Sequence, residues 1–89
     1  GIFPDPQSPG FKHILLQPNF ATDLKQFKAT HMSPYGEIIS EWEVKGKKVT
    51  YNVTIPANST ATLTLPSYIK VDKRTVKLES GKHSFTYRL

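Results

Sequence analysis

The sequence of residues 37–54 is EIISEWEVKGKKVTYNVT, and its apolar and polar side chains alternate on both sides of Lys45-Gly46. Because successive side chains of a β-strand point to opposite faces, this period of two predicts two strands, each covered on one side. A two-residue loop that contains glycine allows such strands to fold back as an antiparallel hairpin. The stretch therefore predicts an antiparallel β-sheet.

The hairpin register that this loop predicts turns the large apolar side chains to one face. It sets Trp42 opposite Val49, and it sets Glu43 opposite Lys48, so that opposite charges meet on the other face. Tyr51 belongs to the apolar face as well. We therefore expect Trp42 and Tyr51 to lie in a core and not on an exposed surface that stacks against sugar rings.

Further short segments with the same alternation lie before and after the hairpin, separated by Pro, Gly and Asn. Residues 24–31 are the most polar of them, which favours an edge position. Strands at this spacing predict an all-β fold, an antiparallel β-sandwich of the jelly-roll or Ig-like kind with seven or eight strands. The expected strands are residues 11–17, 24–31, 37–44, 47–53, 60–65, 68–71, 76–78 and 82–89.

The composition excludes several classes of protein. The chain has 89 residues, enough for one domain, and no cysteine, so neither a disulfide nor a thiolate zinc site is expected. No apolar stretch reaches the length of a membrane helix. The net charge is +5, but ten of the twelve cations are lysines spread along the strands, which argues against a nucleic-acid partner. We expect no cofactor, no metal, no nucleic acid and no membrane partner.

The first ten residues contain Pro4, Pro6, Pro9 and Gly10, a composition that favours extended backbone over a regular element. We expect residues 1–10 to be a linker from a catalytic domain that this chain lacks, and residues 11–89 to form the single β-sandwich domain. Targeting information would then lie upstream, so the sequence leaves the localisation unknown.

The first expected strand of that domain has apolar side chains on both of its faces. One face meets the core, whereas the other face carries Phe11, His13 and Leu15 and needs a second cover. A histidine among apolar neighbours is usually a hydrogen-bonded packing residue. Glu41 and Glu43 share a strand face at about the spacing of an inverting carboxylate pair, but nearby lysines favour a solvated surface.

Three segments resemble the C-terminal β-sandwich domain of bacterial α-L-rhamnosidases. They are residues 9–14 (PGFKHI), residues 33–36 (SPYG) with the strand that contains Ser40-Glu41-Trp42, and residues 53–62 (VTIPANSTAT) leading to Leu65-Pro66. The ending, residues 79–85 (ESGKHSF), is similar to the closing strand of that family, and the resemblance covers nearly the whole chain. His31-Met32 departs from it, because the family commonly has an aromatic residue just before the turn.

The resemblance implies an accessory domain without catalytic residues. In those enzymes an (α/α) barrel carries the two carboxylates that hydrolyse terminal α-L-rhamnosides with inversion. This chain lacks the barrel and should be inactive alone. The resemblance further implies that the catalytic barrel of the same polypeptide is the partner, with Phe11 and Leu15 at the interface. It also implies that His13 reaches a rhamnose-containing glycan from the side of the sugar pocket.

Two other functions stay open on the sequence. The first is an independent carbohydrate-binding module, which would need exposed aromatic side chains. The second is an Ig-like structural or adhesive module, which would have tandem sandwich repeats or a short leader upstream. Calorimetric titration of the chain with rhamnose separates the first alternative from the accessory domain, for which we expect no heat of binding.

Overall fold

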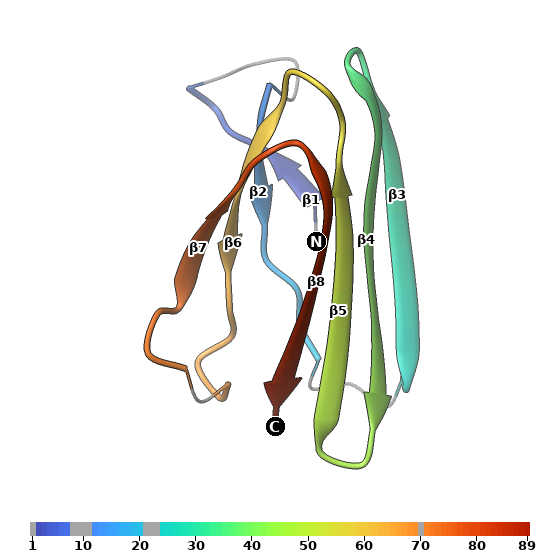
Figure 1. Ribbon diagram of the computed structural model, residues 1–89, viewed down its shortest axis with the longest axis vertical. Helices are drawn as coiled ribbons and strands as arrows, with labels where there is room; N and C mark the ends of the chain where they lie inside the picture. The colour runs from blue at the N-terminus through green and yellow to red at the C-terminus, as the bar shows by residue number, and fades with distance from the viewer. Residues whose placement is uncertain (1, 8–11, 21–23, 70) are drawn as a thin grey trace.

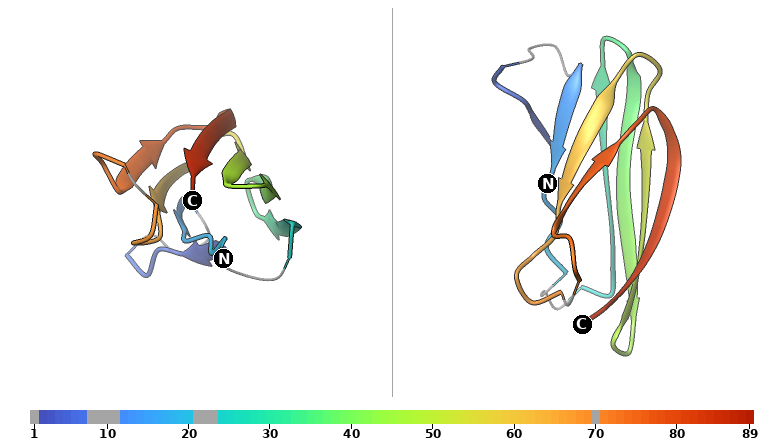
Figure 2. Two further views of the ribbon diagram at one scale, coloured as in Figure 1. Left: turned by 90° about the horizontal axis from the view of Figure 1, so that it is seen from below. Right: turned by 60° about the vertical axis from the view of Figure 1, so that its left-hand side comes forward.

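The computed structural model describes residues 2–7, 12–20, 24–69 and 71–89, which form two four-stranded sheets that face each other (Figures 1 and 2). Sheet A has the strand order β1-β2-β6-β7, and sheet B has the order β3-β4-β5-β8. The all-β sandwich is confirmed, and the polar strand β3 is an edge strand as expected. The strands are β1 (Ile2–Pro4), β2 (His13–Leu16), β3 (Gln26–Ser33), β4 (Gly36–Lys45), β5 (Lys48–Ile55), β6 (Thr60–Thr64), β7 (Thr75–Leu78) and β8 (Gly81–Arg88).

The core lies between the sheets and follows the alternation of the strands. Trp42 and Tyr51 are 6% and 0% exposed, so their expected core position is confirmed. The Tyr51 hydroxyl lies 2.8 Å from the Ser40 hydroxyl, and burial raises the pKa of Tyr51 to about 12 although this hydrogen bond opposes the shift. The buried apolar residues are Ile14, Leu16, Phe20, Ile38, Trp42, Val49, Tyr51, Val53, Ile55, Ala61, Leu63, Leu65, Ile69 and Leu78.

The loop of the β4–β5 hairpin differs by one residue from the expected loop. It consists of Gly46 and Lys47, and Gly46 has a φ of 63°. Trp42 therefore pairs with Tyr51 and not with Val49. Because the loop moves by one residue, the partner of each β4 residue changes by two residues, and every side chain stays on its expected face.

The prediction that Glu43 and Lys48 face each other across this hairpin is wrong. Glu43 pairs with Thr50, and Lys48 stands opposite Lys45. The ion pair that forms instead lies within β4, where Lys45 Nζ is 3.3 Å from Glu43 Oε1. The end of the hairpin therefore has more uncompensated positive charge than the sequence alone indicates.

The structure differs from the expected linker at Ile2–Pro4, which form β1 and pair with β2. Pro4 is compatible with a strand here because β1 is at the edge of sheet A, where a backbone N–H is not needed. The pairing of β2 with β6 is parallel, in a fold that is otherwise antiparallel. A connection from residues 1–10 to a catalytic domain stays a prediction.

The prediction of a strand at residues 68–71 is wrong for residues 68, 69 and 71, and residue 70 lies outside the described residues. Residues 67 and 68 form a turn, in which the Ile69 N–H donates to the Pro66 carbonyl, and Ile69 is buried. The Tyr68 hydroxyl donates to Asn19 Oδ1 and accepts from the Phe20 N–H, both at 2.7 Å. Ile69 therefore closes one end of the core, and Tyr68 holds the segment Asn19-Phe20, which follows β2, in place.

Candidate functional site

The outward face of sheet A contains the expected site residues His13 and Leu15. Leu15 is half-buried and stands between Phe3 of β1 and Thr62 of β6 in one cross-strand row. Phe3 is 47% exposed. The structure thus places Leu15 and His13 on one outward face, and it adds the exposed ring of Phe3. Phe11, the third expected residue of this face, lies outside the described residues.

Two threonine hydroxyls of β6 hold the His13 ring. His13 Nδ1 lies 2.7 Å from Thr60 Oγ1, and His13 Nε2 lies 2.8 Å from Thr62 Oγ1. A neutral imidazole has one donor and one acceptor nitrogen, so one threonine accepts and the other donates. The accepting threonine keeps its own O–H group for a further partner. The parallel β2–β6 pairing creates this cluster, and the alternation of residues contains no signal for it.

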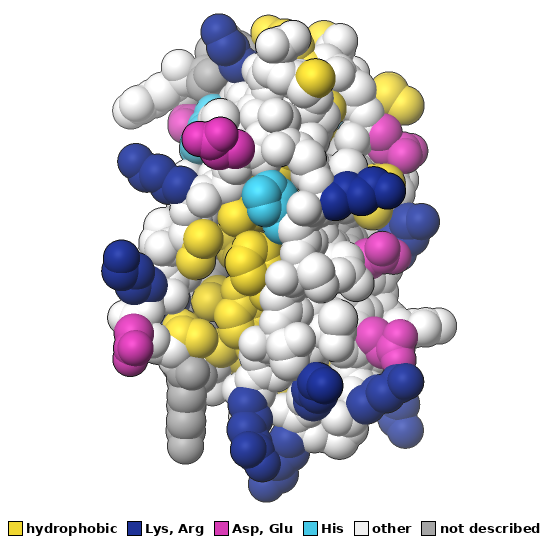
Figure 3. Space-filling model, in the orientation of Figure 1, with side chains coloured by type: hydrophobic (Ala, Val, Ile, Leu, Met, Phe, Trp, Pro, Cys, Tyr) yellow, Lys and Arg dark blue, Asp and Glu magenta, His cyan; other side chains and the backbone are white. Residues whose placement is uncertain are grey.

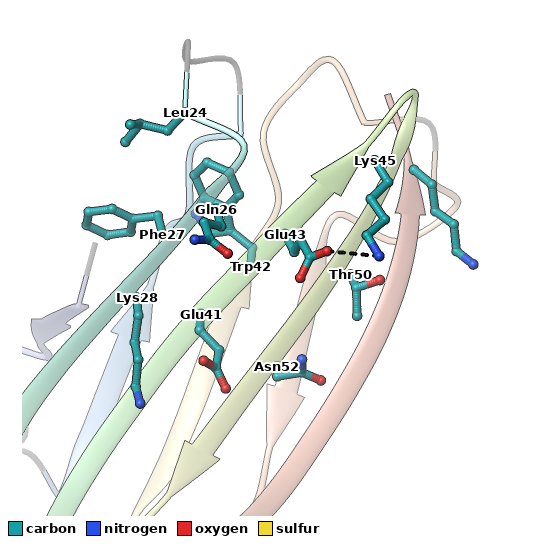
Figure 4. Close-up of a pocket in the computed structure, with 11 residues that line it drawn as sticks. Leu24, Gln26, Phe27, Lys28, Glu41, Trp42, Glu43, Lys45, Thr50 and Asn52 are labelled. Atoms are coloured by element: carbon teal, nitrogen blue, oxygen red, sulfur yellow. Dashed lines mark ion pairs between the residues drawn. The ribbon is translucent and has the colours of Figure 1, made fainter.

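The outward face of sheet B has a shallow hollow that both polar and apolar side chains line. Figure 4 shows Gln26, Glu41, Glu43, Thr50 and Asn52 projecting from the same side of β3, β4 and β5. An inverting pair needs one carboxyl group in an apolar enclosure that keeps it protonated. The Glu43 side chain is instead 50% exposed and ion-paired with Lys45. This geometry supports a surface role for Glu41 and Glu43.

The described part of the chain offers neither a cluster of metal-binding side chains nor a helix that could cross a membrane. Ranges 2–7, 12–20, 24–69 and 71–89 contain no group of three or more His, Cys, Asp or Glu side chains that would suit a metal ion. Within the same ranges, no helix has the length and apolar character needed to cross a bilayer.

Known proteins match the chain in both sequence and fold. The bacterial alpha-L-rhamnosidase C-terminal domain family matches residues 1–80. An alpha-L-rhamnosidase of Formosa agariphila is 36% identical over 62 residues, which are 70% of this chain and 7% of that protein.

Two solved structures share the fold. The crystal structure of native alpha-L-rhamnosidase from Aspergillus terreus superposes with a TM-score of 0.80 and 26% identity over 96% of this chain and 9% of that chain. The alpha-L-rhamnosidase from Dictyoglumus thermophilum gives a TM-score of 0.78 and 20% identity over 92% of this chain and 12% of that chain. The chain thus spans about a tenth of the length of the proteins that it matches, and it belongs to the bacterial alpha-L-rhamnosidase C-terminal domain family.

Proposed function

We propose that this chain is the non-catalytic accessory β-sandwich of an α-L-rhamnosidase, and that the outward face of sheet A packs on the catalytic barrel that hydrolyses terminal α-L-rhamnosides. The observation that carries the proposal is the combination of Phe3 and Leu15 with the hydrogen-bonded His13 cluster on one face. Interfaces between domains of one chain combine apolar and polar groups in this way. The family membership supplies the enzyme context.

The two outward faces differ in charge, and this difference favours sheet A as the interface. The outward positions of β6 and β7 carry threonines and one charged residue, Lys77. The outward positions of β4, β5 and β8 carry many charged side chains, which are depleted from the centres of interfaces. They are Glu37, Glu41, Glu43, Lys45, Lys48, Lys82 and Arg88.

We expect Leu15→Glu in the full-length enzyme to weaken the contact between the sandwich and the barrel. A carboxylate placed in a dry contact loses its hydration. In calorimetry, the sandwich should then unfold separately, with its midpoint lowered by about 4 °C or more. Ile39→Glu is the matched control, because Ile39 is also half-buried but lies on the outward face of sheet B. Equal effects of the two variants on the full-length enzyme would rule out the assignment of the interface to sheet A.

The finer part of the proposal concerns His13 and the sugar. We propose that the His13 ring lies at the side of the rhamnose pocket and binds a sugar hydroxyl, which takes the place of one threonine contact. The support is the position of His13 on the proposed barrel-facing side and its half-exposed ring. Since both ring nitrogens already have hydroxyl partners, the ring is held in a fixed orientation before substrate binds.

We expect His13→Ala in the full-length enzyme to lower kcat/KM on an aryl α-L-rhamnoside by about 3- to 10-fold, the value of one hydrogen bond. Thr64→Ala is the control, because it removes a hydroxyl from the same strand face two residues further along β6. Urea unfolding of both variants checks that the fold is intact. An unchanged kcat/KM for folded His13→Ala would end the role of His13 in sugar binding.

A further inference from the structure

Four cationic side chains gather where the β4–β5 hairpin turns and β8 ends. Lys45, Lys47, Lys48 and Arg88 line a single hollow together with Thr86 and Tyr87. Figure 3 shows Lys and Arg side chains crowded at this lower end of the molecule. Acidic side chains lie mostly further up the same view. The charge of the chain is therefore unevenly distributed, and this end is strongly positive.

Three of these cations form one cross-strand row. Lys45 of β4 stands opposite Lys48 of β5, and Lys48 stands opposite Arg88 of β8. Side chains that face each other across strands are about 5 Å apart, and like charges in such positions destabilise a sheet. Glu43 offsets the charge of Lys45 at 3.3 Å. The row thus has an electrostatic cost that an anionic ligand would relieve.

The row continues into the hollow of sheet B, because Lys45 and Lys48 line both hollows. The polar lining of the sheet B hollow also includes the amides of Gln26 and Asn52 and the hydroxyl of Thr50. Figure 4 shows these neutral groups beside Glu43 on the same side of the sheet. Amides, hydroxyls and carboxylates are hydrogen-bond partners for sugar hydroxyls. Cations at one end and neutral polar groups beyond them suit a ligand with both kinds of group.

We propose that the row Lys45–Lys48–Arg88 binds the carboxylate or sulfate groups of an anionic polysaccharide, whose neutral hydroxyls lie along the hollow of sheet B. This proposal rests on the proposed function, since an α-L-rhamnosidase acts on glycans. Sheet A packs on the barrel in that function, which leaves the face of sheet B open to substrate. The sandwich would then hold a charged chain near the enzyme, while the barrel removes its rhamnose.

The chemistry of the hollow favours a polysaccharide over a nucleic acid. Three of the four cations are lysines, and only Arg88 has the forked guanidinium group that suits the edges of bases. Glu41 and Glu43 line the adjoining hollow, where a carboxylate accepts hydrogen bonds from the hydroxyl groups of sugar units but finds no donor on a phosphate backbone. Tyr87 stands opposite Val49 on the inward face of β8 and is half-buried, which leaves it unsuited to stack on bases.

The test measures the binding of this chain to polygalacturonate and to dextran sulfate by affinity electrophoresis, with neutral dextran as the uncharged comparison. We expect both polyanions, or one of them, to retard the chain and neutral dextran not to. The polyanion that binds more tightly shows whether carboxylate or sulfate is the preferred group. In the triple variant Lys45→Gln/Lys48→Gln/Arg88→Gln, the affinity should fall by about tenfold or more.

The matched control is Lys73→Gln/Lys77→Gln/Lys82→Gln, which removes the same number of positive charges from exposed sites outside both hollows and should change the affinity by about twofold or less. Glu43→Gln should bind more tightly, because it frees Lys45. Equal losses in the two triple variants would show binding by net charge and overturn the proposal. So would the absence of binding to both polyanions, or tighter binding to a DNA duplex that depends on the row. None of these results involves the barrel, so they leave the sheet A interface standing.

Discussion

Replacing Trp42 with alanine should lower the free energy of unfolding by about 3 to 5 kcal/mol, the range for a large aromatic side chain lost from a core. The Trp42 side chain is 6% exposed and packs edge-on against Phe20, with 5.5 Å between the ring centroids. The vacated volume lies between two sheets whose hydrogen-bonded strands cannot close on it. Domains of this size have a stability of about 5 to 15 kcal/mol. Urea unfolding followed by circular dichroism measures the change.

Phe27→Ala is the matched control for the Trp42 variant. Phe27 stands opposite Trp42 on the neighbouring strand, with 6.1 Å between the ring centroids, but its side chain is 46% exposed. Its removal should therefore cost about 1 kcal/mol, since little apolar area returns to water. Trp42→Phe gives an intermediate value if the alanine variant fails to fold. A loss for Phe27→Ala as large as that for Trp42→Ala would contradict the core position of Trp42.

The alternation of residues predicts strand faces well, because a side chain changes face only when a strand shifts by an odd number of residues. Trp42 and Tyr51 are accordingly buried as expected, although their partners are not the expected ones. The correct loop follows from turn chemistry. With Gly46 first in the loop, glycine takes the positive φ of a type II′ turn, whereas a Lys45-Gly46 loop of type I′ would require that conformation of lysine.

The alternation of apolar and polar residues does not predict which distant segments of the chain come into contact. Alternation predicts that His13 and Leu15 share an outward face, but it does not say which strands flank them. The partners of His13 are 47 and 49 residues away, on a strand that pairs in parallel. The alternation of residues also gives no signal for Phe3, because β1 has only three residues, contains Pro4 and is recognisable only by its pairing with β2.

Two of the segments that resemble the rhamnosidase family meet in space, and this contact explains part of their sequence. In the turn between β3 and β4, the Ser33 hydroxyl donates to the Gly36 carbonyl at 2.8 Å and accepts from the Tyr35 N–H. Gly36 then lies against Pro56, which follows β5. The two motifs therefore form one structural unit at this end of sheet B. The contacts of Ser33, Gly36 and Pro56 serve the fold, whereas Thr60 and Thr62 at the end of the second motif belong to the His13 cluster.

Gly36→Ala tests this unit and should lower the free energy of unfolding by about 2 to 4 kcal/mol. Gly36 has a φ of +136°, a conformation that side chains rarely adopt, and an added Cβ would lie 3.0 Å from the Pro56 Cβ. Gly81→Ala is the control, because Gly81 has a similar φ of +118° but none of the described residues comes within 4 Å of its added Cβ.

The control should therefore show the backbone strain alone, about 1 to 2 kcal/mol, and Gly36→Ala should exceed it by the cost of moving Pro56. Urea unfolding of the two variants under the same conditions gives the difference. Equal decreases in the free energy of unfolding would mean that Pro56 can move away from the added Cβ at no measurable cost. The two motifs would then be coupled only through the β4–β5 ladder, and the positive φ of Gly36 alone would account for the glycine of the Ser33-Pro34-Tyr35-Gly36 turn.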